Sequence, residues 1–381
     1  MRGELIMKKI CILMLHLQHG GIEKQTISLA NQLCKYYEIE IITFYSMNKS
    51  PAYSLDDRVK VRYLFNGAPN RDEVKAAIKA KNPISILKEG WKAAKILYLK
   101  KHLMIKEIKA LKCDFVFSTR IEYAEMLTRY APDGVITMTQ EHLHDDSEKY
   151  VNRVKKAFSG LDYLLVLCGG SKANYSRWLA ENKKIKIVEI PNILDSIPEE
   201  SSALDGMRLV AAGRLHPVKN FDILIDVFSL VHKELPQSSL TIVGGGDEHS
   251  RLAEHAAALG LSDAVTFTGM VSSDEVMNCF QNSDIYVMTS RTECLPMVLL
   301  EAASVGLPLV AFDVPVGPAS LIVEDKNGFL LDYADKQAMA ERIIFLLKDR
   351  ERLEKMGSNA KAMAASYTAE EVVPKWQELF G

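Results

Sequence analysis

The stretch Ser290-Arg-Thr-Glu-Cys-Leu-Pro-Met-Val-Leu-Leu-Glu-Ala-Ala-Ser-Val-Gly-Leu-Pro308 decides how the chain folds. Its apolar residues recur at helical spacing from Leu295 to Val305, and Pro296 suits a first helical turn. Gly306, which is followed by a proline, is typical of a helix end. The stretch therefore predicts a short loop followed by an apolar helix.

Two glutamates, Glu293 and Glu301, lie in this stretch with seven residues between them. The run from Asp284 to Thr289 predicts a short buried strand before the loop, so Glu293 falls in the loop and Glu301 on the helix. Open α/β sheets bind ligands at the carboxyl ends of their strands, where a carboxylate can accept hydrogen bonds from sugar hydroxyls. Taken alone, the pair also fits a solvated Glu293 and a Glu301 that caps a surface turn.

A second strand end carries two cations. The run from Met207 to Gly213 predicts a strand that ends in glycine, with Arg214 directly after it and Lys219 at the start of the next helix. A glycine and two cations at a helix N-terminus favour an anion such as a diphosphate. The alternative is that both cations only balance Asp222 and Asp226 on the surface.

Other predicted strand ends carry glycines or histidines. Gly20 and Gly21 separate a strand from a helix, although such a turn is also a common tight connection. His142 and His144 alternate on an extended segment, so they share no face for a metal. Gly244 begins a Gly-Gly-Gly turn after another predicted strand, and such a turn can accompany any nucleotide or none.

Together, these motifs resemble the retaining glycosyltransferases of family 4, in which an E-x7-E pair and an Arg/Lys pair hold a nucleotide sugar. The resemblance covers nearly the entire chain and implies the α/β GT-B fold, with two Rossmann-like, doubly wound parallel-sheet domains facing an interdomain cleft. We expect an acceptor-side domain at residues 1–194, a polar linker at 195–205, a nucleotide-sugar domain at 206–365, and a C-terminal helix at 366–381 that crosses back to the first domain.

The resemblance also implies roles for individual residues. Arg214 and Lys219 would stabilise the leaving diphosphate, Glu293 would bind the donor sugar, Glu301 the ribose, and His142 the donor sugar or the acceptor. Glu293, Arg214, Lys219 and His142 form the expected catalytic group. The expected donor-binding residues are Gly20, Gly21, Gly213, Arg214, Lys219, Gly244, Met270, Val271, Glu293, Cys294, Leu295, Pro296, Met297, Val298 and Glu301.

The expected activity is transfer of a sugar from a nucleotide diphosphate sugar, taken as a UDP-sugar, to a saccharide or lipid-linked hydroxyl in surface polysaccharide or glycolipid synthesis. Neither a metal nor a cofactor is expected. A sugar phosphorylase, an epimerase and a non-catalytic sugar-nucleotide-binding subunit remain alternatives. The missing G-x-G-x-x-G after the first strand argues against a dinucleotide oxidoreductase.

Composition bounds the class of protein. A chain of 381 residues with 48% hydrophobic residues supports two domains. A net charge of -2 argues against bulk nucleic-acid binding, and no apolar run is long enough to span a bilayer. Scattered cysteines and the lack of a recognisable signal peptide predict a cytoplasmic protein.

The segment 74–112 departs from this balance, with eleven lysines and two glutamates among apolar and aromatic residues. It predicts helices with one apolar and one cationic face. We expect an anionic membrane surface as a partner, which would place the protein on the inner face of the membrane. The alternative is a solvated lysine-rich surface on helices that pack their other side into the domain.

Overall fold

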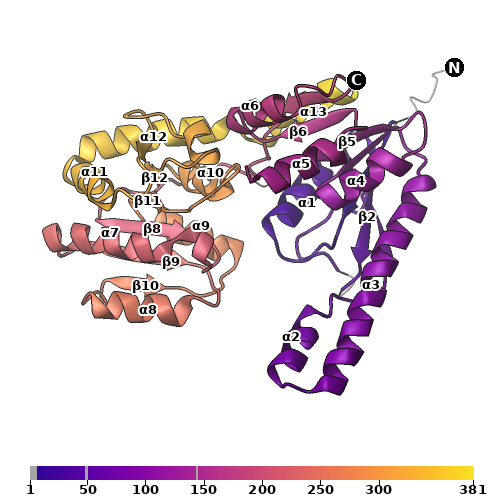
Figure 1. The fold of residues 1–381 in the computed structure, drawn as a ribbon. Coiled ribbons are helices and arrows are strands. Elements are labelled where there is room, and N and C mark those ends of the chain that lie inside the picture. Colours follow the sequence, from indigo (N-terminus) through magenta and orange to yellow (C-terminus); the bar gives the residue numbers. More distant parts are fainter. Residues whose placement is uncertain (1–6, 48–49, 143–144) are drawn as a thin grey trace. The chain divides into compact units, whose positions relative to one another are not determined.

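The computed structural model describes residues 7–47, 50–142 and 145–381, which divide into two compact units. The first unit comprises residues 1–166, 174–189 and 379–381, and the second comprises residues 167–173 and 190–378. Each unit has its own parallel β-sheet (Figure 1). The expected pair of Rossmann-like, parallel-sheet domains is confirmed.

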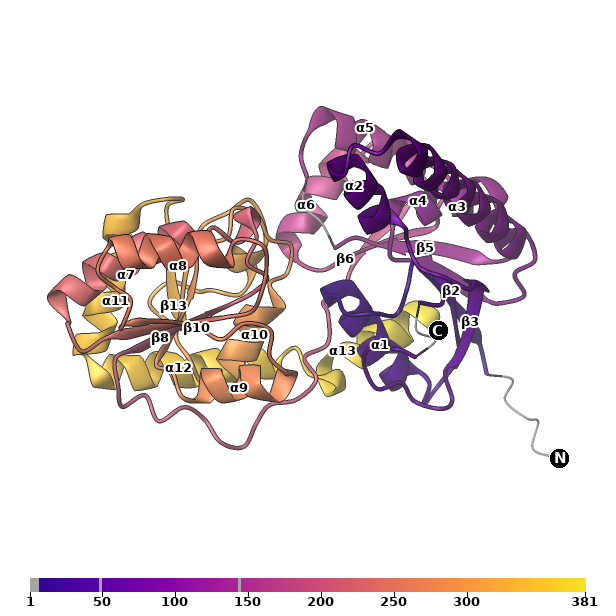
Figure 2. The ribbon, with the colours of Figure 1, turned by 90° about the horizontal axis from the view of Figure 1, so that it is seen from below.

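The first unit is a seven-stranded sheet with the order β3-β2-β1-β4-β5-β6-β7. Figure 2 shows α3, α4 and α5 on one face of this sheet and α1 on the other. The strands are β1 (Lys9–Met14), β2 (Glu38–Tyr45), β3 (Lys60–Phe65), β4 (Phe115–Ser118), β5 (Ile136–Gln140), β6 (Tyr163–Val166) and β7 (Lys186–Glu189). The helices are α1 (Gly21–Leu33), α2 (Arg71–Lys79), α3 (Pro83–Lys109), α4 (Ile121–Tyr130), α5 (Glu148–Ala157) and α6 (Gly169–Trp178), the last of which has its first residues in the second unit.

The second unit is a six-stranded sheet with the order β10-β9-β8-β11-β12-β13. Figure 2 shows α7, α8 and α11 on one face of this sheet and α9, α10 and α12 on the other. The strands are β8 (Arg208–Ala212), β9 (Ser239–Val243), β10 (Val265–Phe267), β11 (Ile285–Met288), β12 (Leu309–Phe312) and β13 (Gly328–Leu331). The helices are α7 (Phe221–Glu234), α8 (His249–Ala258), α9 (Ser273–Gln281), α10 (Met297–Ser304), α11 (Lys336–Lys348), α12 (Arg350–Ala365) and α13 (Ala369–Phe380), with 3₁₀ turns η1 (Pro217–Lys219) and η2 (Gly317–Ser320).

Buried parallel strands explain the long apolar runs of the sequence. Five of the six residues of β1 are buried, and only the first is partly exposed. All four residues of β11 and all four of β12 are buried. Both faces of each sheet carry helices, so these strands have no solvent-facing side that would require polar residues. The positions of these strands can therefore be predicted correctly from their runs of apolar residues.

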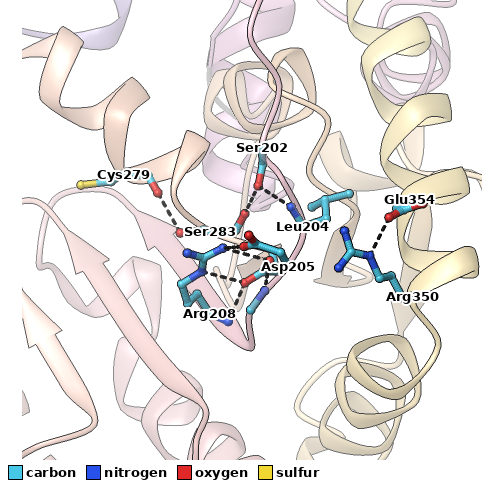
Figure 3. Close-up of polar contacts among 10 residues, drawn as sticks. Ser202, Leu204, Asp205, Arg208, Cys279, Ser283, Arg350 and Glu354 are labelled. Carbon is cyan, nitrogen blue, oxygen red and sulfur yellow. Dashed lines mark hydrogen bonds and ion pairs between the residues drawn. The ribbon is translucent and has the colours of Figure 1, made fainter.

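The segment predicted to be a linker, residues 195–205, is packed against the second unit. Ser202 is buried and its hydroxyl donates to the backbone oxygen of Ser283, while Leu204 is buried in the apolar core (Figure 3). Farther on, Arg208 forms ion pairs with Asp205 and with the fully buried Asp284. The polar composition of residues 195–205 therefore reflects specific hydrogen bonds and ion pairs.

The last residues of the chain belong to the first unit. The ring of Phe380 packs edge-on against Tyr37, with 5.2 Å between ring centroids, and in a tilted arrangement against Phe115, with 4.8 Å between centroids. The ammonium group of Lys8 donates to the backbone oxygens of Phe380 and Gly381. These contacts fix the end of α13, which the sequence analysis assigned to a crossing helix.

Among the described residues, no helix combines the length and the apolar character needed to cross a membrane.

Candidate functional site

The order of strands in the second unit defines where a ligand site is expected. β8 and β11 are neighbours, and the chain connects them to strands on opposite sides of the sheet. At such a switch point the loops that follow the two strands diverge and leave a crevice at the carboxyl edge. The loop after β8 carries Gly213, Arg214 and Lys219, and the loop after β11 carries Glu293.

Lys219 and Glu293 meet directly at this edge. The Nζ atom of Lys219 lies 2.6 Å from Oε1 of Glu293, and the two side chains are 22% and 14% exposed. Their sequence separation of 74 residues shows that the fold, and not local structure, brings them together. Two residues predicted for different parts of the donor thus form a single, partly buried ion pair.

The backbone around Lys219 departs from the predicted continuous helix. Lys219 is the last residue of the 3₁₀ turn η1. His216 precedes this turn, and its Nδ1 atom accepts a hydrogen bond from the backbone N–H of Val218. Asn220 adopts a left-handed conformation with φ of 58°, so α7 begins only at Phe221. The break turns the chain immediately after Lys219 and separates this residue from the body of the helix.

Two residues that the sequence analysis did not single out hold this turn. Arg291 donates from its backbone to the oxygen of Val218 at 2.8 Å, and from its side chain to Pro217 O at 3.1 Å and to Asn220 Oδ1 at 2.9 Å. The hydroxyl of Thr289 lies 3.2 Å from Lys219 O and 3.1 Å from Asn220 O. The only sequence signal for Arg291 is its place two residues before Glu293.

Glycine is required where these loops approach one another. Gly244 has φ of 130°, and a Cβ atom built on it would lie 2.2 Å from the backbone oxygen of Gly213. Gly317 has φ of 71°, and a Cβ atom there would lie 2.7 Å from the oxygen of Cys294. Larger residues would separate the loops that carry the candidate site. Gly317, like Arg291 and Thr289, was not singled out from the sequence.

In the second unit, Arg214 and Met270 are exposed members of the predicted donor site. Among the described residues, no carboxylate forms an ion pair with Arg214, so its guanidinium is available to an anion. Met270 is 80% exposed and lies over Gly245, and Val271 beside it is half-buried. The bridge between Gly244 and Gly269 brings this loop to the glycine-rich turn after β9.

The loop from Cys294 to Val298 forms the rest of the edge. Cys294, Leu295 and Pro296 are buried, whereas Met297 and Val298 are half-buried in the first turn of α10. Pro296 is the N-cap of this helix and does not belong to its first turn.

A segment from the first half of the sequence packs against this loop. The Sγ atom of Cys168 lies 3.7 Å from the oxygen of Cys294, and the hydroxyl of Ser171 lies 3.6 Å from the Cys294 sulfur. These contacts explain why residues 167–173, predicted to belong to the first domain, group with the second unit.

Glu301 lies on α10, as predicted, and is half-buried. Its charge and that of Glu293 both act on Tyr286, a buried strand residue whose hydroxyl bonds to the backbone of Ala212. Burial raises the pKa of Tyr286, and the two carboxylates shift it in the same direction. Both glutamates therefore lie near the end of β8, where the predicted phosphate loop begins.

In the first unit, the Gly20-Gly21 loop precedes α1, and the carboxylate of Glu23 folds back over it. The Glu23 Oε2 atom lies 2.1 Å from the position that a Cβ atom on Gly20 would occupy, and Oε1 lies 3.6 Å from Nδ1 of His16. Burial lowers the pKa of His16. A larger residue at position 20 would displace this carboxylate.

His142 follows β5, next to the buried Glu141. Burial lowers the pKa of His142 to about 4, and its Nε2 atom is buried without a hydrogen-bond partner among the described residues. Burial raises the pKa of Glu141 to about 7, although the hydroxyl of Tyr150 donates to it at 2.7 Å. Near neutral pH, His142 is therefore an uncharged group that can donate or accept a hydrogen bond.

A metal site that combines His142 with His144 cannot be described, because His144 lies outside the described residues. Within the described part of the chain, no group of three or more histidine, cysteine or acidic residues is arranged to hold a metal ion.

The family model "Glycosyl transferases group 1" matches residues 194–363, which include the loops after β8 and β11. Residues 194–363 are therefore similar to a glycosyltransferase group 1 domain, and the two parallel-sheet units have the fold of solved GT-B glycosyltransferases such as GtfA.

The chain is similar to several proteins named for polysaccharide synthesis or sugar transfer. It is 28% identical to the exopolysaccharide phosphotransferase SCO2592 of Streptomyces coelicolor, over 95% of this chain but only 39% of that protein. It is 27% identical to the amylovoran biosynthesis glycosyltransferase AmsD of Erwinia amylovora, over 98% of this chain and 99% of AmsD. The structure of the pneumococcal O-GlcNAc transferase GtfA with UDP and GlcNAc superposes with a TM-score of 0.78, at 18% identity, over 98% and 99% of the two chains. At this identity the likeness to GtfA concerns the fold.

Proposed function

We propose that the protein is a metal-independent, retaining glycosyltransferase that uses a nucleotide diphosphate sugar, and in particular a UDP-sugar. The acceptor is the hydroxyl of a saccharide or a lipid-linked saccharide in the synthesis of a surface polysaccharide such as a capsule, or of a glycolipid. The observation that carries this proposal is the convergence of Arg214, Lys219 and Glu293 at the switch point between β8 and β11. The pathway named for AmsD and the UDP in the GtfA structure support the choice of acceptor and donor.

The cations act on the leaving group. During transfer, the acceptor oxygen forms a bond to the anomeric carbon while the bond from that carbon to the β-phosphate oxygen breaks. Arg214 and Lys219 stabilise the negative charge that develops on the diphosphate, and the acceptor proton passes to the departing phosphate oxygen. These two cations supply charge that a metal ion would otherwise provide, which is the basis for proposing metal independence.

The remaining site residues position the donor and the acceptor. Glu293 accepts hydrogen bonds from the donor sugar, Glu301 accepts them from the ribose, and backbone groups of Met270 and Val271 hold the base. The loop from Cys294 to Val298 contributes backbone amides to the sugar or the phosphates. His142, whose Nε2 atom is buried without a hydrogen-bond partner among the described residues, contacts the sugar or the acceptor, and the Gly20-Gly21 loop lies next to the phosphates or the acceptor.

A donor panel tests the proposal. Purified protein is heated with UDP-, GDP- and ADP-sugars, and a bound donor raises the unfolding temperature by mass action. UDP-sugars should produce the shift in the wild-type chain but not in Lys219→Ala or Arg214→Ala. The absence of any shift with all donors would overturn the proposal.

Two further measurements address the finer points. Turnover of the selected donor should survive chelation of divalent metals by EDTA, and the anomeric configuration of the product, read by NMR, should equal that of the donor. Loss of turnover in EDTA that Mg²⁺ restores would contradict metal independence, and an inverted product would contradict retention.

A further inference from the structure

Helix α3 carries an apolar stripe on its exposed side. Ile84, Leu87, Trp91 and Tyr98 are 80%, 76%, 71% and 66% exposed. Spacings of three, four and seven residues place them along one face of the helix, which we call the α3 stripe. From the sequence we expect this segment to contact an anionic membrane surface, and the alternative is that its helices pack their apolar side into the domain.

The remainder of α3 explains why this stripe faces outward. Ile96, Met104 and Ile108 are the buried residues of the helix, and they point to the opposite side, into the first unit. The N-terminal half of α3 runs beside α2 and away from the strands of the sheet (Figure 1). Asn82 caps this half of the helix by accepting hydrogen bonds from the backbones of Ile84 and Ser85, each at 3.1 Å. The stripe is therefore displayed on an ordered helix.

Exposed apolar residues are concentrated in this region. Single exposed apolar side chains are ordinary on protein surfaces, whereas a contiguous group marks an interaction site. Half of the fourteen large apolar side chains that are exposed in the described part of the chain fall between residues 78 and 98. They are Ile78, Ile84, Ile86, Leu87, Trp91, Leu97 and Tyr98.

The charge around the stripe identifies its partner. Eleven lysines and two glutamates give segment 74–112 a formal charge of +9, so the rest of the chain carries -11. Among the described residues, only Lys92 of these eleven lysines has a carboxylate within ion-pair distance, Glu89 at 3.8 Å. Lys88 and Lys95 lie one turn beyond Ile84 and Trp91 on the same face. The surface is thus both apolar and strongly cationic.

We propose that this face of α3 docks on an anionic phospholipid bilayer. The α3 stripe enters the boundary between head groups and acyl chains, where aromatic side chains such as Trp91 and Tyr98 are favoured, and the lysines bind anionic head groups. A second copy of this chain would cover the apolar residues but would bring two sets of lysines close together, and their like charges would repel one another. The inference extends the proposed function by giving the enzyme a surface on which to meet a lipid-linked acceptor, and its test does not require turnover.

Vesicle binding tests the proposal with the full chain. Sedimentation with vesicles of phosphatidylcholine and phosphatidylglycerol should show binding, whereas vesicles of phosphatidylcholine alone should bind at least about tenfold more weakly. Raising the salt concentration should weaken binding, because screening acts on the lysines. Emission from Trp91 should shift to the blue and be quenched by brominated lipids, and this quenching should disappear in Trp91→Phe.

Two variants separate the apolar and the cationic contributions. Leu87→Ser with Trp91→Ser, and separately Lys88→Gln with Lys95→Gln, should each weaken binding by about tenfold. Val323→Ser with Lys355→Gln is the matched control, because Val323 is 55% exposed and Lys355 is an exposed lysine of the second unit, outside the candidate site. All four altered positions of the test variants are exposed, and thermal unfolding confirms that the variants are folded.

Three outcomes would overturn the proposal. They are no binding to anionic vesicles, binding that the α3 variants leave unchanged, and a concentration-dependent dimer that only the Leu87 and Trp91 changes abolish. The donor-induced thermal shift of the α3 variants should equal that of the wild type. The membrane proposal and the proposed transferase activity can therefore fail independently of one another.

Discussion

Lys219 and Glu293 form an ion pair of 2.6 Å across the switch point between β8 and β11. Each residue is assigned to a different part of the proposed donor, the phosphates and the sugar. A donor that draws the ammonium group of Lys219 to its phosphates must therefore compete with Glu293. Conversely, the pair holds both side chains at the same edge, which limits the conformational entropy lost when a donor binds.

A double-mutant cycle tests the coupling between these residues. We expect Lys219→Ala to lower kcat by about 100-fold or more, because it removes charge stabilisation from the leaving phosphate. In unfolding experiments, Lys219→Ala, Glu293→Ala and the double variant should give a coupling free energy of about 1 kcal/mol, as for other partly exposed pairs. Lys348→Ala, which breaks an exposed ion pair with Glu234 in the same unit, serves as the control and should leave kcat unchanged. Wild-type turnover in Lys219→Ala would contradict the assigned role.

Arg291 is predicted to act by positioning Lys219. Arg291→Ala removes the side-chain hydrogen bonds to Pro217 and Asn220, each worth about 1 to 3 kcal/mol for a charged donor. We expect the KM for the donor to rise by about tenfold. Arg291→Lys should restore little, because lysine cannot reproduce the planar fork. Arg350→Ala, which removes only an exposed pair with Glu354, is a suitable control (Figure 3). An unchanged KM in Arg291→Ala would show that the turn holds Lys219 without this side chain.

The sequence predicts the elements around the site because their signals are local. The apolar run before Thr289 forms β11, Glu293 lies in the loop and Glu301 lies on α10. Strands covered on both faces are apolar throughout, so the alternation of strands and helices follows from composition.

Features that depend on distant parts of the chain could not be predicted in this way. The left-handed Asn220 is held by Arg291, 71 residues away, and Ser202 is held by Ser283, 81 residues away. Trp91 points outward because the other side of α3 packs into the first unit. Since α3 has apolar residues on two sides, its sequence alone does not indicate which side is buried. In each case the conformation is determined by contacts with distant residues, and the local sequence does not indicate these contacts.

Asp284 is predicted to stabilise the second unit without taking part in binding. It is fully buried at the start of β11, where its carboxylate accepts hydrogen bonds from the backbones of Gly206 and Arg208 and from the Arg208 side chain. Asp284→Ala leaves these donors without an acceptor, and we expect a loss of about 3 kcal/mol. The matching decrease in Tm is on the order of 10 °C for a unit of this size.

The control for this prediction is Asp205→Ala, because Asp205 pairs with the same arginine but is 54% exposed. We expect its effect to be below about 1 kcal/mol. Donor affinity of Asp284→Ala, measured well below its Tm, should equal that of the wild type, since Asp284 lies at the opposite end of β11 from Glu293. A loss of donor affinity at full folding would contradict a purely stabilising role.

The neighbours Glu141 and His142 are predicted to give opposite pH dependences of stability. Burial raises the pKa of Glu141 from about 4.3 to about 7, so the folded protein retains a proton that the unfolded chain has lost, and stability falls as pH rises through this range. Burial lowers the pKa of His142 from about 6.5 to about 4, so the unfolded chain gains a proton first, and stability falls as pH decreases. Between about pH 4.3 and pH 6.5 the two slopes, each up to about 1.4 kcal/mol per unit, oppose one another.

Single variants should reveal the two slopes. The free energy of unfolding in urea is measured between about pH 5 and pH 6.5 for each variant and compared with that of the wild type. For Glu141→Gln this difference should rise with pH by up to about 2 kcal/mol. For His142→Phe it should fall with pH by a similar amount. Groups that are shared by all three proteins cancel in these differences, among them Tyr150, Tyr175, Glu122 and Arg153, which act on Glu141. Glu148→Gln, at an exposed position in the first turn of α5, should show no such trend. Differences that stay constant with pH for both Glu141→Gln and His142→Phe would mean that neither group titrates as its burial requires, and would remove the basis for treating His142 as a neutral contact to a sugar.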